Sequence, residues 1–137
     1  MKLGYVRTSA GEESLAAQLE AIRAAGAVRI WEDHGISGSA VLKPAYMEMC
    51  DYARPGDEII VWRLDRLSRS LITLICDLQA LGERQVEFRS LCEDIDTTAP
   101  EGRSFFHTVA AFTAFGHDVQ RERAEAETGM GAARLQD

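Results

Sequence analysis

The chain has 137 residues, 46% of them hydrophobic, and a formal net charge of −7, which fits one domain with one core and argues mildly against a polyanionic partner. No apolar run approaches the roughly 18 residues of a membrane-spanning helix, and the N-terminus lacks the apolar core of a signal peptide. We therefore expect one soluble, cytoplasmic folded unit.

Four short runs that contain β-branched or aromatic residues are predicted to be strands: Leu3–Arg7, Arg29–Glu32, Glu58–Arg63 and Val86–Leu91. Helical patterns separate them. This alternation predicts βαβ units with right-handed crossovers, and therefore a mainly parallel sheet with helices on both faces. The expected fold class is α/β, with a flavodoxin-like sheet of four or five strands.

Three helical stretches lie between the predicted strands. Ser14–Ala25 places its apolar residues on one stripe, with Ser14 as a candidate cap. Pro44–Tyr52 is a shorter candidate that begins with proline, a residue favoured in the first turn of a helix. Leu67–Leu81 carries leucine and isoleucine at helical spacing.

The last segment predicts one long helix, from about Gly102 to about Glu127, after a capping-box pattern at Thr98 and Glu101. Such a helix extends about 39 Å at about 1.5 Å per residue, which is farther than a domain of this size can cover. Its first half carries two apolar stripes: Phe105, Val109, Phe112 and Val119, and Phe106, Ala110 and Thr113. We expect a partner subunit to cover them, although a single broad core-facing stripe would also account for the pattern.

The chain has three cysteines, which are far apart and have apolar neighbours: Cys50, Cys76 and Cys92. This favours reduced thiols in the core over disulfides or a metal site. The three histidines are also widely separated, with no evident cysteine or carboxylate partner: His34, His107 and His117. We therefore expect neither a bound metal nor a catalytic histidine.

The candidate site lies where two predicted strands end. Ligands of an open parallel sheet bind beyond the carboxyl ends of the strands, where the strand order reverses. Arg7 and Ser9 follow the first strand, and Arg66 and Arg69 follow the third. In a flavodoxin-like order these strands are neighbours, so the four side chains should share one crevice.

Arginines around a serine suggest phosphoryl transfer. A serine hydroxyl is a poor nucleophile without a base or a strong local field, and guanidinium groups stabilise the charge that develops on phosphate oxygens. Asp65 would hold an arginine in place by a charge-assisted bond, or take part in proton transfer. Each residue alone has a plainer interpretation, Ser9 as a turn residue and the arginines as partners of nearby acids. The sequence patterns of dinucleotide sites and P-loops are absent.

Five motifs, taken in order, resemble the serine recombinases, closest to the resolvase and DNA-invertase branch. They are GYVRTS at residues 4–9, SLAAQL at 14–19, DHGISG at 33–38, VWRLDRLSRS at 61–70, and FRSL leading to IDTT over residues 88–98. The resemblance covers roughly residues 2–126. Several motifs in a fixed order make it far more specific than any one of them.

The resemblance implies a catalytic domain in which Ser9 attacks a DNA phosphodiester and leaves a 5′-phosphoserine link and a free 3′ hydroxyl. By the same resemblance Arg7, Arg66 and Arg69 bind the phosphate, and Asp65 is the active-site aspartate. The supporting positions are Gln18, Lys43, Glu122 and Arg123. No cofactor or metal is implied, because the phosphoserine bond conserves the energy needed for rejoining.

The resemblance also implies partners and a division of the chain. Residues 1–100 form the resolvase-like catalytic domain, 101–127 form a long oligomerisation helix of that domain, and 128–137 form a flexible tail. The expected partners are DNA and a second copy, with a tetramer in synapsis, in a bacterial-type cytoplasm. A helix-turn-helix domain usually follows in this branch; we expect it to be absent here and therefore expect weak, non-specific DNA binding.

The chain departs from the family pattern at four residues, in three places. Lys43 stands before Pro44 where arginine is usual, Gly116-His117 replaces a glutamate-arginine pair, and Gln85 replaces a glycine before the fourth strand. These changes leave an alternative, a catalytically weakened or non-catalytic dimerisation module. A flavodoxin-like receiver or small-anion binder is a third hypothesis, but it predicts acidic or cofactor-binding residues where this chain has arginines.

Overall fold

The computed structural model describes residues 1–9, 11, 14–36, 43–68, 70–104, 107–108, 111 and 121–122. The chain divides into two compact units, Met1–Arg103 and Ser104–Asp137. None of the helices within the described ranges has the length and apolar content that crossing a bilayer requires.

The first unit is built on a five-stranded sheet with the order β2-β1-β3-β4-β5. The strands are β1 (Lys2–Thr8), β2 (Arg29–His34), β3 (Glu58–Val61), β4 (Glu87–Ser90) and β5 (Ile95–Asp96). β1 to β4 pair in parallel, and β5 pairs antiparallel with β4. The flavodoxin-like order is therefore confirmed, in its five-stranded form.

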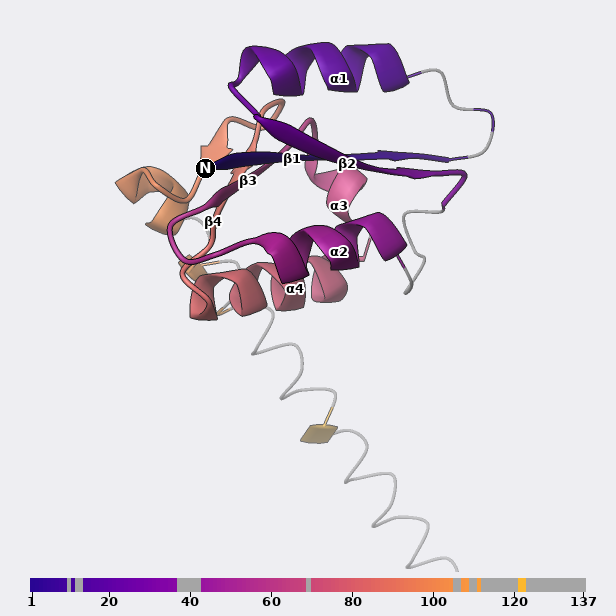
Figure 1. The fold of residues 1–137 in the computed structure, drawn as a ribbon. Helices are drawn as coiled ribbons and strands as arrows, with labels where there is room; N and C mark the ends of the chain where they lie inside the picture. Colours follow the sequence, from indigo (N-terminus) through magenta and orange to yellow (C-terminus); the bar gives the residue numbers. More distant parts are fainter. Residues whose placement is uncertain are drawn as a thin grey trace, which may run out of the picture. The chain divides into compact units, whose positions relative to one another are not determined.

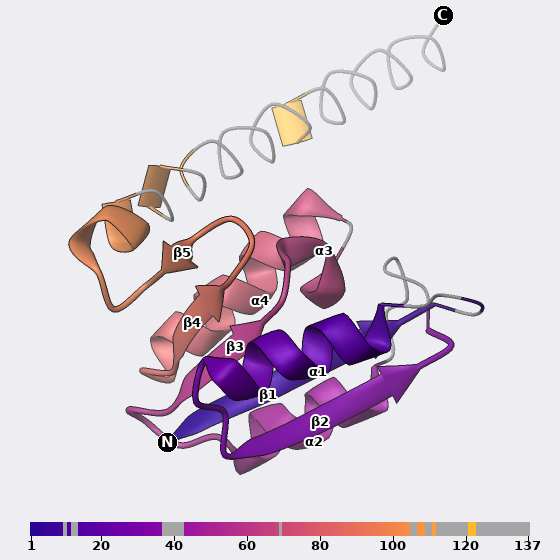
Figure 2. The same cartoon turned by 90° about the horizontal axis from the view of Figure 1, so that it is seen from above.

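Helices cover both faces of this sheet, as predicted. They are α1 (Leu15–Ala24), α2 (Pro44–Tyr52), the single turn α3 (Leu64–Leu67) and α4 (Leu71–Glu83). α1 lies on one face, while α2 and α4 lie on the other (Figures 1 and 2). α3 follows β3 directly and stands at the carboxyl end of the sheet, where the candidate site was expected.

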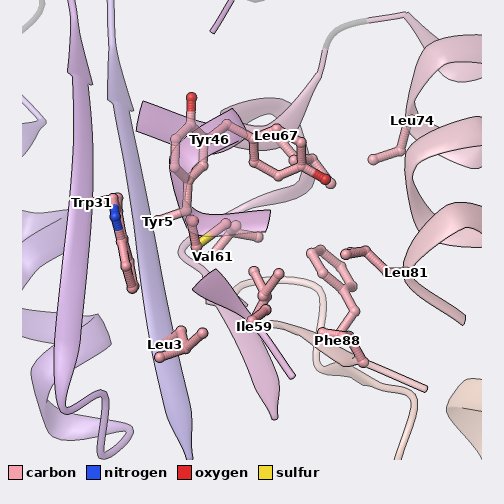
Figure 3. Close-up of a cluster of buried hydrophobic side chains, with 13 residues drawn as sticks. Leu3, Tyr5, Trp31, Tyr46, Ile59, Val61, Leu67, Leu74, Leu81 and Phe88 are labelled. Carbon is pink, nitrogen blue, oxygen red and sulfur yellow. The ribbon is translucent and has the colours of Figure 1, made fainter. Parts of the chain in front are cut away.

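Side chains that alternate along the strands pack into two separate hydrophobic cores, one on each face of the sheet. Leu3 and Tyr5 of β1 join the larger cluster with α2 and α4, whereas Val6 joins the smaller cluster beneath α1. Figure 3 shows Ile59 of β3 and Leu81 of α4 in the larger cluster. A one-residue shift of β1 would exchange these sets, so the two-sided burial fixes the register that places the residues after Thr8.

The predicted helix Leu67–Leu81 is wrong at its start. The chain forms the short turn α3, leaves helical geometry at Ser68 (φ −159°, ψ 149°) and begins α4 only at Leu71. Ser70 caps α4 by accepting a hydrogen bond from the Thr73 amide at 3.4 Å. The apolar spacing continues across this break, which is why periodicity alone merged the two helices.

Two predicted caps are also wrong in their bonding. Ser14 occupies the position before α1, but its hydroxyl makes no capping bond and accepts from Gln18 Nε2 at 2.9 Å. The Thr98 hydroxyl donates to Asp96 Oδ1 at 2.6 Å instead of capping the Glu101 turn. Residues 100–104 are nevertheless helical, so the start of the last helix was placed correctly.

The prediction of core cysteines is wrong for two of the three. Cys76 and Cys92 are exposed, Cys50 is half-buried, and all three are free thiols. Cys76 follows the buried Ile75 on α4 and therefore points away from the sheet. Apolar neighbours on an amphipathic helix do not imply that the residue between them is buried.

Gln85 forms the turn before β4 in a left-handed backbone conformation, with φ 61°. Glycine adopts this conformation without the Cβ crowding that costs other residues about 1–2 kcal/mol. Gln85→Gly should therefore raise the free energy of unfolding by about 0.5–1 kcal/mol after the entropy of the freer unfolded chain is included. Denaturant unfolding measures this.

Gln79→Gly is the matched control for that change. Gln79 is an exposed residue of α4, where glycine should destabilise by about 1 kcal/mol. If both variants changed the free energy of unfolding by the same amount in the same direction, the left-handed turn at Gln85 would not be the cause.

The second unit is described at residues 104, 107–108, 111 and 121–122, all helical. The Thr108 hydroxyl donates to the Ser104 carbonyl at 3.0 Å, a bond along one helical turn. Glu122 is exposed. The apolar stripes expected to dimerise, the Gly116-His117 pair and Arg123 lie outside the described residues.

Candidate active site

Arg7, near the end of β1, is fully buried and joins three segments of the chain. Its guanidinium donates to the carbonyl oxygens of Asp65 at 2.6 Å and Arg66 at 3.2 Å, both on α3. It also donates to the Ile36 carbonyl at 2.7 Å, beyond β2. The predicted convergence of the segments after the first and third strands is confirmed, and Arg7 is the residue that connects them.

Ser9 lies just beyond β1, half-buried, within reach of the same guanidinium. Arg7 Nη1 donates to Ser9 Oγ at 3.3 Å. A guanidinium at this distance orients the hydroxyl oxygen and stabilises negative charge that develops on it. The two residues that the sequence placed at this strand end therefore form one donor-acceptor unit.

Arg66 and Asp65 occupy consecutive positions on α3. Arg66 is 2% exposed, and its Nη1 donates to the Arg7 carbonyl at 3.4 Å. Asp65 Oδ1 accepts a hydrogen bond from Arg63 Nε at 3.2 Å and lies 3.3 Å from Arg66 Nε, an ion-pair contact without hydrogen-bond geometry. The ion pairs predicted for Asp65 are present, and its role in the reaction stays a prediction. Arg69 lies outside the described residues.

Gln18 reaches the site from α1. Its side chain is fully buried, and Nε2 donates to the Arg7 carbonyl at 3.0 Å. The Arg7 carbonyl thus accepts from both Gln18 and Arg66, which fixes the backbone just before Ser9. Gln18 Oε1 is buried without a hydrogen-bond partner among the described residues.

Lys43 precedes α2 and is only 4% exposed. Its ammonium donates to the Leu67 carbonyl at the end of α3, so it supports the turn that carries Asp65 and Arg66. Burial lowers the pKa of Lys43, Asp77 opposes that shift and Arg7 adds to it. Burial also raises the pKa of Asp77, while Lys43 lowers it.

Substitution of Lys43 should alter how stability depends on pH. Because the pKa of Lys43 in the fold lies below its ordinary value of 10.5, the unfolded chain binds more protons between the two pKa values. The parent should therefore gain free energy of unfolding relative to Lys43→Met as the pH rises toward 10.5. Denaturant unfolding at a series of pH values measures the difference, and Lys2→Met, which removes an exposed lysine, controls for the loss of one charge. A constant difference across the series would contradict the buried ammonium.

Sequence reasoning missed a chain of polar contacts at the outer edge of the site. His34 lies opposite Thr8 in the β1–β2 register, with His34 Nδ1 and Thr8 Oγ1 2.9 Å apart. His34 Nε2 lies 3.2 Å from Glu32 Oε1. The statement that the histidines have no carboxylate partner is therefore wrong for His34. The two-residue spacing of Glu32 and His34 on one face of a strand would have revealed the pair.

Asp33 was also missed as an anchor of the site. It is 5% exposed, and its carboxylate accepts from the Tyr5 hydroxyl at 2.9 Å and from the Ala45 and Tyr46 amides at 2.9 and 3.1 Å. These bonds attach the start of α2 to β2, and they place Lys43 beneath α3. Within the described ranges, no three His, Cys, Asp or Glu side chains gather as a metal ion would require.

Comparison with known proteins identifies the family. The family model for the resolvase N-terminal domain matches residues 2–136. The chain belongs to the resolvase family. The match confirms the resemblance to serine recombinases that the sequence motifs predicted, over almost the whole chain.

Curated relatives of the resolvase domain include invertases and resolvases. A DNA-invertase of Escherichia phage P1 is 38% identical over 136 residues, which are 99% of this chain and 72% of that protein. The transposon Tn552 resolvase of Staphylococcus aureus is 43% identical over 136 residues, covering 98% of this chain and 68% of that protein. Among solved structures, the N-terminal catalytic domain of TP901-1 integrase superposes with a TM-score of 0.74 at 26% identity, over 87% of this chain and 98% of that one.

Proposed function

We propose that this resolvase domain is the catalytic domain of a site-specific DNA recombinase. It cleaves and rejoins DNA through a covalent 5′-phosphoserine link at Ser9. The observation that carries the proposal is the 3.3 Å contact between Arg7 Nη1 and Ser9 Oγ, beside the buried Arg66 and its partner Asp65. Relatives named DNA-invertase, resolvase and serine recombinase support the same reaction.

We assign the roles from the family resemblance and, for Ser9, Arg7, Arg66 and Asp65, from the positions of their side chains as well. Ser9 Oγ forms a bond to phosphorus while the bond from phosphorus to the 3′ oxygen breaks; the serine proton departs and the 3′ oxygen takes one up. Arg7 and Arg66, together with Arg69, stabilise the charge that develops on the phosphate oxygens. Asp65 keeps the arginines in place, and the reverse reaction rejoins the strand.

The supporting residues act through these groups. Gln18 fixes the backbone before Ser9, and Lys43 fixes the end of α3. We assign residues 1–100 to the catalytic domain and 101–127 to an oligomerisation helix in which Glu122 and Arg123 support assembly. DNA is the substrate, and two copies form the dimer that pairs into a tetramer in synapsis. The relatives do not favour the alternative of a non-catalytic module.

A nicked suicide DNA tests the proposal, because loss of the short 3′ fragment traps the covalent intermediate. The parent should form an adduct that is visible on a denaturing gel, with the DNA located on Ser9 by mass spectrometry. Ser9→Ala should form none. Ser70→Ala is the matched control, because it loses a helix cap worth about 1 kcal/mol and should keep the adduct. Equal adduct from Ser9→Ala and the parent would refute the assignment.

A further inference from the structure

The turn α3 carries the chemistry but cannot hold its own position. It has four residues, so its first amides have no intrahelical partner and its formation gains little from cooperativity. Arg63, the residue before it, contributes no side-chain cap. Yet α3 presents Asp65 and Arg66 and supplies two of the carbonyl oxygens that bind Arg7. Its position must therefore be imposed by other parts of the chain.

Lys43 holds the end of α3, and Glu93 holds its start. The Leu64 amide donates to Glu93 Oε1 at 2.9 Å and lies 3.4 Å from Oε2. This carboxylate occupies the place of a missing N-cap, and it does so from the segment between β4 and β5. Its negative charge also suits the positive end of a helical turn.

Glu93 is itself held by a buried group. The hydroxyl of Ser90, a fully buried residue of β4, donates to Glu93 Oε1 at 2.5 Å. The same oxygen thus accepts from Ser90 and from Leu64, which connects β4 to α3 through one atom.

The backbone just before Glu93 is hydrogen-bonded to the segment that leads from β3 into α3. The Leu91 amide donates to the Val61 carbonyl at 3.1 Å, and the Cys92 amide donates to the Trp62 carbonyl at 2.9 Å. The first bond extends the parallel pairing of β3 and β4 by one residue, and the second lies beyond the ends of both strands. These backbone bonds therefore hold the Glu93 carboxylate beside the Leu64 amide.

We propose that Glu93 is a positioning residue for DNA cleavage. It fixes the start of α3 and thereby sets Asp65, Arg66 and the carbonyl oxygens that orient Arg7 beside Ser9. The inference rests on the proposed function and adds a residue that lies outside the arginine pocket. The positioning role requires an acceptor oxygen at the distance that the Glu93 side chain provides. A negative charge on a shorter side chain is insufficient.

Three substitutions separate reach from charge. Glu93→Gln keeps an acceptor oxygen at the same distance and should form the phosphoserine adduct within about 3-fold of the parent. Glu93→Asp keeps the charge but is one methylene too short, and Glu93→Ala loses both. These two should slow adduct formation by about 10- to 100-fold, since small misplacements of catalytic groups have effects of that size. Glu48→Ala, an exposed acid on α2, is the control and should react like the parent.

A second measurement reports on α3 without requiring activity. In nuclear magnetic resonance spectra of the full chain, Glu93→Ala should move the Leu64 amide and the Arg66 Nε–H signals and speed the exchange of the Leu64 amide with solvent. Glu93→Gln should leave Arg66 near its parent position. Signals that stay in place in Glu93→Ala would overturn the proposal, whatever the activity.

The two readouts also distinguish the two proposals. Moved signals together with a slower adduct support the positioning role, whereas moved signals with a parent-like rate overturn it. A parent that forms no adduct would count against the proposed function alone, and the Leu64 and Arg66 signals would still decide whether Glu93 holds α3.

Discussion

Replacing Arg7 with lysine is expected to lower the stability of the fold and to slow DNA cleavage. Lysine keeps the charge but loses the planar fork that donates to Asp65, Arg66 and Ile36 carbonyl oxygens at once. Each buried carbonyl left without a donor costs about 1–3 kcal/mol. With partial replacement by the lysine ammonium, Arg7→Lys should lower the free energy of unfolding by about 3 kcal/mol.

The same variant should form the phosphoserine adduct at least about 100-fold more slowly, because removal of one preorganised donor from a developing oxyanion has an effect of that size. Denaturant unfolding gives the stability, and the suicide-DNA assay gives the rate. The assay is run where circular dichroism shows that parent and variant are both folded, so that loss of reaction is not loss of fold.

Arg63→Lys is the matched control for Arg7→Lys. Arg63 belongs to the same cluster and lies 3.2 Å from Asp65, but its side chain is 40% exposed. An exposed ion pair contributes about 0–1 kcal/mol, so stability and rate should both stay close to the parent. An unfolding midpoint for Arg7→Lys equal to that of the parent would show that Arg7 does not connect the three segments.

The sheet could be predicted from the sequence because its determinants are local and repeated. The four predicted runs overlap β1 to β4, a helical stripe follows each of the first three, and the handedness of the crossovers leaves few strand orders. β5 has two residues, which is too short for any periodicity to be visible. Its pairing depends on β4, through the opposition of Ser90 and Ile95, and that is known only from the folded chain.

The residues of the candidate site could be named from the sequence, but not all of their contacts. Arg7 lies near the end of β1 and Ser9 just beyond it, so topology alone brought them to the segment that carries Arg66. The sequence does not show that the Arg7 guanidinium donates to three main-chain carbonyls, because any hydrogen-bond donor could bind a carbonyl oxygen. Lys43 illustrates the same point, since the sequence indicated only a supporting lysine in place of the usual arginine, and the structure shows its ammonium donating to the Leu67 carbonyl.

Two of the residues that were missed, Asp33 and Glu93, share one property. Asp33 and Glu93 act on backbone amides of segments far from them in the sequence, Ala45 and Leu64 respectively. Such bonds are specified by the approach of two segments and not by a pattern within either. Motif reasoning therefore identifies the reactive groups of this site more readily than the groups that hold them.

Replacing Gly102 with alanine is expected to displace the start of the last helix. Gly102 is buried, and a Cβ placed on it would lie 1.9 Å from the Asp96 carbonyl oxygen and 2.6 Å from the carbonyl carbon. Both atoms belong to the backbone of β5, which is paired with β4, so no side chain can move aside. Gly102→Ala should lower the free energy of unfolding by about 2–3 kcal/mol, the usual range for overpacking.

Gly82→Ala is the control for the same chemical change in open space. Gly82 lies on α4 with no atom within 4 Å of a Cβ, and alanine there should raise stability by about 0.5–1 kcal/mol. The two variants should therefore shift the denaturant midpoint in opposite directions. The displaced turn includes Arg103, whose Nε donates to the Thr97 carbonyl at 2.7 Å. Amide exchange at residues 97–103 should accordingly quicken in Gly102→Ala alone, and unchanged exchange there would refute the close packing of this turn on β5.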